Sequence, residues 1–430
     1  MIESETQIST KTPAGKLVAA GVIVLALVFA WFAVRWQIGS LLVEITNVEQ
    51  PNAAEFASSA MNLAPADPQP FWLAGVKERE GFSEENLVRS LGYLEKAVRL
   101  APYDYRMWIE LGRGLEQGEL FDEAEPAFLR AVELAPNYAF PRWQYGNFLL
   151  RRGREDEAFG EFRKTTEKGI IYREQVFSLA WNYFDQDPAK VESLAADTPE
   201  VRVYLADFFA QRGAGADAVR VWNKLSAEEK AEQKELAALI ARQLYTRRLY
   251  RDALEFARET GVDKEAEHEA VTNPGFETFI GQHDQALFGW QIFRNENRVD
   301  IGTDTSVKTE GNRSLKVNFR LFNKPEFYNI VQVVTVEPDT SYRLSFRVRT
   351  ENLRSGSMPI LDVLGGKDSS LLARSPAFAT GTADWQEISV NFRMPPEGTS
   401  IELRVVREYC ELECPITGIF WLDDFRLTRN

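Results

Sequence analysis

The pattern of hydrophobic and polar positions divides the chain into three segments of different periodicity. Residues 17–34 form an unbroken apolar run without a charged side chain. Between residue 51 and about residue 260, apolar and small residues recur three and four positions apart, as in helices that bury one face. From residue 273 onward, short alternating runs are separated by Gly, Pro, Asn and Asp, as in strands joined by turns. The pattern therefore predicts a multidomain protein in which a helical segment precedes an all-β segment.

The apolar run has the length of a membrane-spanning helix. Its 18 residues would extend roughly 27 Å, close to the ~30 Å hydrocarbon core of a bilayer. Lys16 and Arg35 bracket the run, and Trp31 and Trp36 suit the membrane interface. A cleaved signal peptide is the alternative, although its hydrophobic region is usually shorter and no clear Ala-x-Ala site follows here. We therefore predict a single N-terminal transmembrane anchor over residues 17–36.

The positive charges that flank this anchor predict its orientation. Lys11, Lys16 and the α-amino group precede the run, whereas Arg35 is the nearest cation after it. Because cationic flanks stay in the cytoplasm, residues 1–16 are expected to be a cytoplasmic tail. The remaining domains would then be extracytoplasmic, in the periplasm at a bacterial inner membrane.

The helical segment contains copies of a repeat that is 34 residues long. One copy is marked by Trp108, Leu111, Gly112, Leu115, Ala124, Phe128, Ala131 and Pro136. Adding 34 reaches Gly146, Leu149, Ala158 and Phe162, and the phrase Leu-Ala-Pro occurs at 63–65, 100–102 and 134–136. Degenerate copies are marked by Leu205, Ala206, Phe209, Ala218, Trp222 and Leu225, and by Ile240, Ala241, Leu244, Ala253 and Ala257.

These positions resemble the tetratricopeptide consensus, W-x2-LG-x2-[LY] followed by A-x3-F-x2-A and a closing proline. The resemblance implies an all-α solenoid of about five repeats over residues 51–265. Small residues such as Gly112 and Ala124 would let paired helices approach closely, and the proline would end the second helix. The repeat-defining residues are therefore expected to be structural. The resemblance further implies that the groove of the array binds a protein partner.

Strand-like runs continue to the C-terminus. Five of them occupy residues 314–321, 329–336, 342–350, 385–394 and 400–406. The phrases NPGFE (273–277), GW (289–290), EGNRSLKV (310–317), DWQEISVNF (384–392) and FWLDDFRL (420–427) occur in the order seen in jelly-roll carbohydrate-binding modules. Residues 272–430 thus resemble such a module, and an all-β jelly-roll sandwich is expected.

The resemblance implies a structural calcium site at one end of this sandwich. In the family, acidic groups from the opening phrase, from the segment before G-x-x-S-L and from the closing D-D phrase converge. The matching residues here are Glu277, Glu310 and Asp424, with Asp423 as an alternate. Carboxylate and carbonyl oxygens suit Ca²⁺. The alternative is that these residues are ordinary charges at strand ends.

A glycan site is the second expectation from the resemblance. Sugars stack on exposed aromatic rings and form hydrogen bonds with Arg, Gln and Asn. Tyr328 and Gln332 are expected on one face of a strand, with Arg347 and Arg349 alternating on its neighbour. The tryptophans of the module phrases, Trp290, Trp385 and Trp421, are expected in the core.

Charge and rare residues narrow the chemistry. The net charge is −14, of which residues 272–430 carry −3, so the excess lies in the N-terminal part and argues against a nucleic-acid partner. The chain has two histidines, His268 and His283, and two cysteines, and their spacing does not fit a Cys/His zinc cluster. Cys410 and Cys414 are close enough in sequence for a small disulfide in an oxidising compartment, or they are unpaired thiols.

Motifs of catalysis are missing as well. The sequence contains no Gly-rich phosphate loop, H-E-x-x-H helix or G-x-S-x-G elbow. We therefore expect a non-enzymatic, membrane-anchored scaffold of the bacterial cell envelope, in exopolysaccharide or surface assembly. Its repeats would bind a protein, and its sandwich a polysaccharide. The alternatives are a protein assembly factor with a sandwich that binds nothing, and a glycan-active hydrolase.

Overall fold

The computed structural model describes residues 12–278, 280, 286–294, 297–324, 326–407, 410 and 414–430. Most of the predicted cytoplasmic tail, residues 1–11, lies outside the described residues. The chain divides into two compact units, 1–185 with 193–196, and 186–192 with 197–430. This division falls within the helical segment and not at its border with the strands. The second unit therefore contains both the last helices and the whole sandwich.

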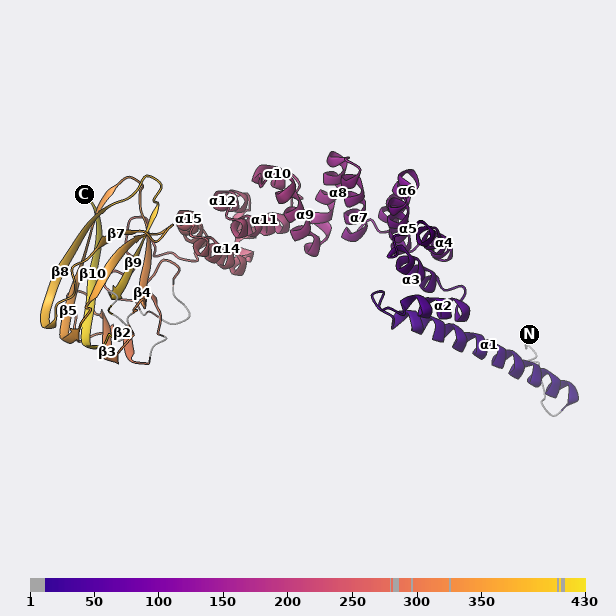
Figure 1. Ribbon diagram of the computed structural model, residues 1–430, viewed down its shortest axis with the longest axis horizontal. Coiled ribbons are helices and arrows are strands. Elements are labelled where there is room, and N and C mark those ends of the chain that lie inside the picture. The colour runs from indigo at the N-terminus through magenta and orange to yellow at the C-terminus, as the bar shows by residue number, and fades with distance from the viewer. Residues whose placement is uncertain are drawn as a thin grey trace, which may run out of the picture. The chain divides into compact units, whose positions relative to one another are not determined.

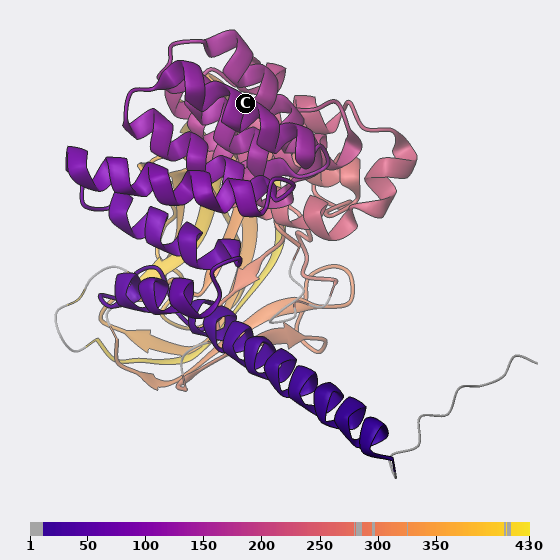
Figure 2. The same ribbon diagram turned by 90° about the vertical axis from the view of Figure 1, so that its right-hand side faces the viewer.

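The first unit begins with one long apolar helix, α1 (Pro13–Glu44). Figure 2 shows α1 as a single unbroken helix, long and apolar enough to cross a membrane. It continues beyond the predicted end of the anchor at residue 36. Val43 is buried in a cluster with α2 (Ala53–Leu63) and α3 (Pro68–Arg79), and Ser40 donates a 2.5 Å hydrogen bond to Asp67. Its C-terminal end is thus part of the packed helical array.

The other helices of the first unit pack in pairs. They are α3 with α4 (Glu84–Leu100), α5 (Tyr105–Gln117) with α6 (Phe121–Leu134), and α7 (Ala139–Arg151) with α8 (Glu155–Lys168), followed by α9 (Ile170–Tyr183). A Cβ atom on Gly112 would lie 3.1 Å from the Phe128 ring, and one on Gly146 would lie 2.6 Å from the Phe162 ring. The repeat glycines therefore permit the close helix contact that the consensus implies.

The second unit continues the solenoid with shorter helices. They are α11 (Pro199–Arg212), α12 (Gly215–Trp222), α13 (Ala227–Glu232), α14 (Lys234–Thr246) and α15 (Tyr250–Thr260), and the short α10 (Pro188–Ser193) lies at the border of the units. The residues that mark the two degenerate repeats are all buried. The tetratricopeptide-like solenoid is confirmed through residue 260.

Within the described residues, two five-stranded antiparallel sheets form the sandwich (Figure 1). Sheet A has the order β1-β4-β9-β6-β7, with β1 (Gln291–Ile292), β4 (Ile330–Thr335), β9 (Ser400–Arg407), β6 (Pro359–Gly365) and β7 (Leu371–Arg374). Sheet B has the order β2-β3-β10-β5-β8, with β2 (Val299–Asp304), β3 (Ser314–Phe322), β10 (Ile416–Arg429), β5 (Ser341–Ser355) and β8 (Gly381–Arg393). The jelly-roll sandwich is confirmed.

One continuous apolar core lies between the two sheets. Trp290 belongs to it, with its ring 5.2 Å from that of Phe276 and 4.8 Å from that of Phe425. Of the other two tryptophans, Trp421 is buried as predicted, whereas the prediction for Trp385 is wrong. Trp421 is buried outside this core, beneath cationic side chains, and Trp385 is only half-buried on a strand at the edge of sheet B.

Candidate functional site

Charged residues form a row across the outer face of sheet A. On β6 and β9, Leu361, Val363, Leu403 and Val405 point into the core, so the residues between them point outward. The strand register pairs Asp362 with Arg404 on one side and with Arg374 on the other. Three strands that are far apart in the sequence therefore bring these three side chains side by side.

Ion pairs hold this row in place. Arg374 contacts Asp362 through two hydrogen bonds of 2.7 and 2.9 Å, the planar fork that guanidinium and carboxylate groups favour. Arg404 donates to Glu402 on its own strand at 2.7 Å. Asp362 and Glu402 are both buried. Arg374 and Arg404 therefore each have a buried acidic partner. The row is thus polar and balanced in charge.

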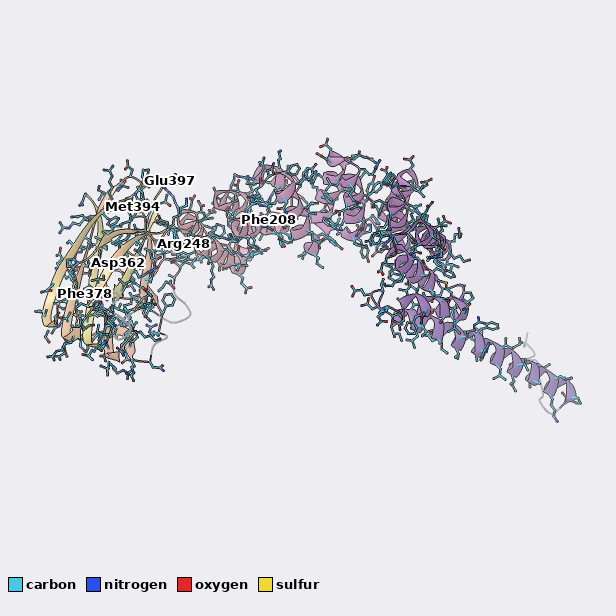
Figure 3. All side chains as sticks on the ribbon, in the orientation of Figure 1. Phe208, Arg248, Asp362, Phe378, Met394 and Glu397 are labelled. Carbon is cyan, nitrogen blue, oxygen red and sulfur yellow. A yellow bond between two sulfur atoms is a disulfide. The ribbon has the colours of Figure 1, made fainter. Side chains whose placement is uncertain are left out.

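Tyr328 adds an aromatic surface to the row. Its side chain is 47% exposed, and the guanidinium carbon of Arg404 lies 5.6 Å from its ring centroid. A hollow of about 540 Å³ lies against these groups. Its lining consists of Tyr328, Asp362, Leu364, Ser369, Leu371, Arg374, Arg404, Val406 and Arg407. We call this the sheet A groove; Asp362 is labelled in Figure 3.

Arg407 lines the groove and also contacts Cys414. Its guanidinium donates to the carbonyl oxygens of Lys324 and Cys414 at 2.9 and 2.8 Å, and to Ser355 Oγ at 2.8 Å. Burial lowers the pKa of Arg407 to about 10. A disulfide joins Cys410 to Cys414, with the Cα atoms 5.7 Å apart. Arg407 therefore ties Cys414 to the end of β9, the central strand of sheet A.

The structure separates the four residues predicted to bind a glycan. Tyr328 lines the groove, but Gln332 is fully buried and exchanges hydrogen bonds of 2.8 and 3.1 Å with the backbone of Thr272. Gln332 shares the core-facing side of β4 with Ile330 and Val334. Arg347 and Arg349 lie on β5, whose neighbours are β10 and β8 in sheet B. The predicted adjacency of these arginines to Tyr328 is wrong.

Arg347 and Arg349 have partners of their own on sheet B. Arg347 lies 3.4 Å from Asp424, and Arg349 lies 3.3 Å from Asp384 while covering the ring of Trp421. These contacts stabilise the outer face of sheet B.

The three carboxylates predicted to hold calcium are also engaged by the protein. Glu277 accepts hydrogen bonds of 2.9 to 3.1 Å from the backbone N–H groups of Asn312 and Arg313. Asp424 and Glu310 both contact Arg426, at 2.8 and 3.7 Å. Among the residues that the structure describes, no group of three acidic, histidine or cysteine side chains is arranged to hold a metal ion.

Asp423, the alternate, is placed differently from Asp424. It is buried, and burial raises its pKa, although the N–H and hydroxyl of Thr309 donate to it at 2.8 Å. A Cβ on Gly275 would lie 3.4 Å from a carboxylate oxygen of Asp423 and 3.6 Å from one of Glu277. Asp423 and Glu277 are thus the acidic pair that this end of the sandwich brings together, and Asp424 does not fit the predicted ligand set.

The residues that the sequence analysis missed are Asp362, Arg374 and Arg404. A signal for one of them is present, because Asp362 interrupts a run of apolar residues on β6, a strand buried on both faces. Such an interruption indicates a polar contact on one face of a sheet. It does not say which strands pair.

A second hollow lies in the solenoid, between α11 and α14. It measures about 600 Å³ and is lined by Gln211, Arg212, Leu239, Arg242, Gln243, Thr246 and Arg247. Within the described part of the chain, Arg242 and Arg247 have no ion-pair partner, and the buried Oε1 of Gln243 accepts no hydrogen bond. No acidic residue lines this hollow, although the chain carries a net charge of −14.

The comparisons with known proteins agree with the two halves of the fold. A family of carbohydrate-binding domains matches residues 268–408. A crystal structure of MamA is 18% identical over 32% of this chain and 77% of its own, with a TM-score of 0.27. The tetratricopeptide protein YrrB, described as having an unusual peptide-binding site, is 23% identical over 37% of this chain and 84% of its own, with a TM-score of 0.29.

A CBM61 module in complex with β-1,4-galactotriose is 20% identical over 38% of this chain and all of its own, with a TM-score of 0.27. No curated protein matches the chain. The chain thus combines a tetratricopeptide-like solenoid with a jelly-roll sandwich, and residues 268–408 match a family of carbohydrate-binding domains.

Proposed function

We propose that this protein is a membrane-anchored, non-enzymatic scaffold whose sandwich binds a glycan in the sheet A groove. The observation that carries the proposal is the groove itself, in which an exposed tyrosine lies beside a row of fixed arginine and aspartate side chains. A sugar ring can stack on the tyrosine, while its hydroxyl groups exchange hydrogen bonds with the charged row. The match of residues 268–408 to carbohydrate-binding domains supports this assignment.

The pairing of Arg374 and Arg404 with carboxylates favours a neutral glycan, and Arg407, the third arginine of the groove, already donates to carbonyl and hydroxyl oxygens. Asp362 already neutralises Arg374, and Glu402 neutralises Arg404. An acidic sugar would have to compete with these carboxylates for the arginines, whereas a hydroxyl group can accept from an arginine and donate to a carboxylate at once.

Binding of the full-length chain to a panel of neutral and acidic polysaccharides tests the proposal. The protein, in detergent micelles, is compared with Tyr328→Ala and with Tyr103→Ala, which removes an 81% exposed tyrosine from the solenoid. We expect a neutral polysaccharide to retain the wild-type protein and the Tyr103→Ala variant, but not the Tyr328→Ala variant. Binding to no member of the panel would leave the sandwich as a domain that binds nothing. Release of reducing sugar would favour the hydrolase alternative.

For the solenoid, we propose a protein partner that presents an acidic segment to the hollow between α11 and α14. Three arginines and the exposed Leu239 suit a chain with carboxylates and an apolar side chain. Copurification from the native membrane would identify the partner. Arg242→Glu with Arg247→Glu should abolish its recovery, and Lys234→Glu, on α14 outside the hollow, should not.

The anchor completes the proposal. Helix α1 would hold the chain in a bacterial inner membrane, with residues from about 36 onward in the periplasm, as part of an exopolysaccharide or surface assembly. The disulfide between Cys410 and Cys414 is compatible with this oxidising compartment. Protease accessibility in spheroplasts tests the orientation, since only a periplasmic solenoid would be digested from outside.

A further inference from the structure

The turns between paired helices of the solenoid share a left-handed backbone residue. Glu119 and Gly153, 34 residues apart, adopt φ of 58° and 70°, and Gly213 and Arg248 adopt 84° and 61°. Glycine reaches this region without strain, whereas a residue with a Cβ atom does so at a conformational cost. Arg248 therefore occupies a position at which glycine would be easier to accommodate. Unlike the glycines at positions 153 and 213, Arg248 carries a side chain that can make a contact from this turn.

The contact that Arg248 makes is with the sandwich. Its Nη1 donates to the carbonyl oxygen of Lys367 at 2.9 Å, to that of Gly366 at 3.4 Å and to Ser369 Oγ at 3.0 Å. These residues form the loop between β6 and β7, and Ser369 lines the sheet A groove. Figure 3 shows Arg248 where the last helices meet the strands. One side chain from the solenoid thus holds a wall of the groove.

Aromatic side chains of the same hairpin pack together beside the sandwich, where α15 contacts β4. Tyr245 packs edge-on against Tyr250 and Phe288, with ring centroids 5.0 and 5.3 Å apart. Burial raises the pKa of Tyr245 and of Tyr250, and the charge of Glu402 raises both further. This acidic residue belongs to β9. It is also the carboxylate that accepts from Arg404 in the groove.

Polar contacts reinforce this junction at the end of β4. Arg251 of α15 lies 3.0 Å from Glu337, and His268 contacts Glu337 at 2.9 Å and Thr335 at 3.0 Å. The backbone N–H of Glu269 donates to the Thr335 carbonyl at 2.8 Å. The helices and sheet A are therefore joined by several independent contacts within one compact unit.

We propose that the glycan site is composite, with the α14–α15 hairpin as part of it and Arg248 as a positioning residue for its β6–β7 wall. The inference rests on the proposed glycan function and deepens it. Arg248 touches no sugar in this arrangement. It holds Ser369 in the position from which this residue lines the groove, through the hydrogen bond to Ser369 Oγ and those to the backbone of Gly366 and Lys367.

Arg248→Gly separates this role from a purely structural one. Glycine relieves the left-handed backbone and removes the three hydrogen bonds to the loop, so the turn should not be weakened. The matched control is Glu119→Gly, which makes the same backbone change at the equivalent turn of another pair. Arg248→Lys retains a cationic donor at the site.

The measurement is the affinity of each full-length variant, in detergent micelles, for a polysaccharide that the wild-type chain retains, together with the melting temperature. We expect Arg248→Gly to bind the polysaccharide about tenfold more weakly and to release it faster. A tenfold change corresponds to the free energy of about one hydrogen bond from a charged group, here to the β6–β7 loop. Glu119→Gly should bind like the wild type, Arg248→Lys should recover part of the affinity, and no variant should melt lower than the wild type.

Equal affinity in Arg248→Gly and Glu119→Gly would overturn the composite site and leave the groove as a property of the sandwich alone. A loss of affinity that follows a lowered melting temperature would overturn it as well, because Arg248 would then be structural. If the wild-type chain retained no polysaccharide of the panel, the proposed glycan function itself would fail, and the composite site with it.

Discussion

The two sheets of the sandwich combine an aromatic ring with arginine in opposite ways. On sheet A, Arg404 lies 5.6 Å from the ring of Tyr328, which stays 47% exposed beside a hollow. On sheet B, Lys316 and Arg349 lie 5.4 and 5.9 Å from the ring of Trp421, which is 2% exposed. The Trp421 N–H is also satisfied, by Asp304 at 3.1 Å. An aromatic ring beside an arginine is thus open to a ligand on one face of the sandwich and covered on the other.

The exposure of the ring therefore separates a binding role from a stabilising role better than residue type does. A tryptophan is the stronger stacking partner for a sugar or a cation, yet Trp421 has no accessible face. The comparison predicts that substitutions on sheet B change stability and that substitutions on sheet A change binding.

The largest expected effect is on the stability of sheet B. Trp421→Ala should lower the free energy of unfolding of the sandwich by about 3 kcal/mol, because it removes a large buried side chain and leaves a cavity under Arg349. The measurement is denaturant unfolding followed by tryptophan fluorescence. Tyr328→Ala, the matched change on sheet A, should cost less than about 0.5 kcal/mol. Similar losses in the two variants would end the distinction between the faces.

If Ca²⁺ stabilises the protein, the end of sheet B also contains a binding site, in this case for an ion. We propose Glu277 with Asp423 as its acidic ligands. At a concentration one hundred times the dissociation constant, Ca²⁺ should add about 2.7 kcal/mol and raise the melting temperature by several degrees. Glu277→Gln should abolish the rise, whereas Asp424→Asn, at a carboxylate already paired with Arg426, should keep it. An unchanged melting temperature on adding EDTA and then Ca²⁺ would exclude the site.

The effect on sheet A is expected in affinity. Tyr328→Ala should weaken glycan binding by about tenfold, the free energy of one stacking contact, and Tyr328→Phe should keep most of the affinity because the ring face remains. Isothermal titration of the full-length chain with the retained polysaccharide measures both. If Trp421→Ala weakened binding as strongly while the sandwich stayed folded, the binding face would have been assigned to the wrong sheet.

The smallest effect concerns pH and a pair that joins sheet B to the segment after the solenoid. The Arg429 guanidinium, donating to Glu269 at 2.6 and 2.7 Å, holds the pKa of Glu269 below its ordinary value of 4.5, against the opposing effect of burial. The pair's contribution is therefore complete above pH 4.5 and is lost as the pH falls through the lowered value. The loss should be at most about 1 kcal/mol, because the pair is partly exposed.

Unfolding of wild type and Glu269→Gln between pH 3 and pH 7 (about the range over which a carboxylate titrates) checks this contribution. The difference between the two proteins should shrink at the acidic end. A difference that stayed constant with pH would show that the carboxylate charge contributes nothing.

The helical array and the strands were open to prediction because their signals are local. The 34-residue recurrence of Gly112 and Phe128 follows from the contact of two helices within one repeat. The alternation in strands such as β3 and β5 reflects burial on one face only. On β4 that signal fails, because apolar residues occupy both faces, and Gln332 was placed on the wrong one.

The sequence by itself determined the three segments of this protein, the helix pairs, the strands and the presence of an aromatic residue at position 328. Each depends on residues within one helix pair or one strand. Tertiary structure alone decided that Asp362, Arg374 and Arg404 share a row, that Trp421 is covered, and that Arg248 reaches the β6–β7 loop. The physical reason is that strand order and register are properties of the assembled sheets, and no single strand carries enough information to specify its neighbours.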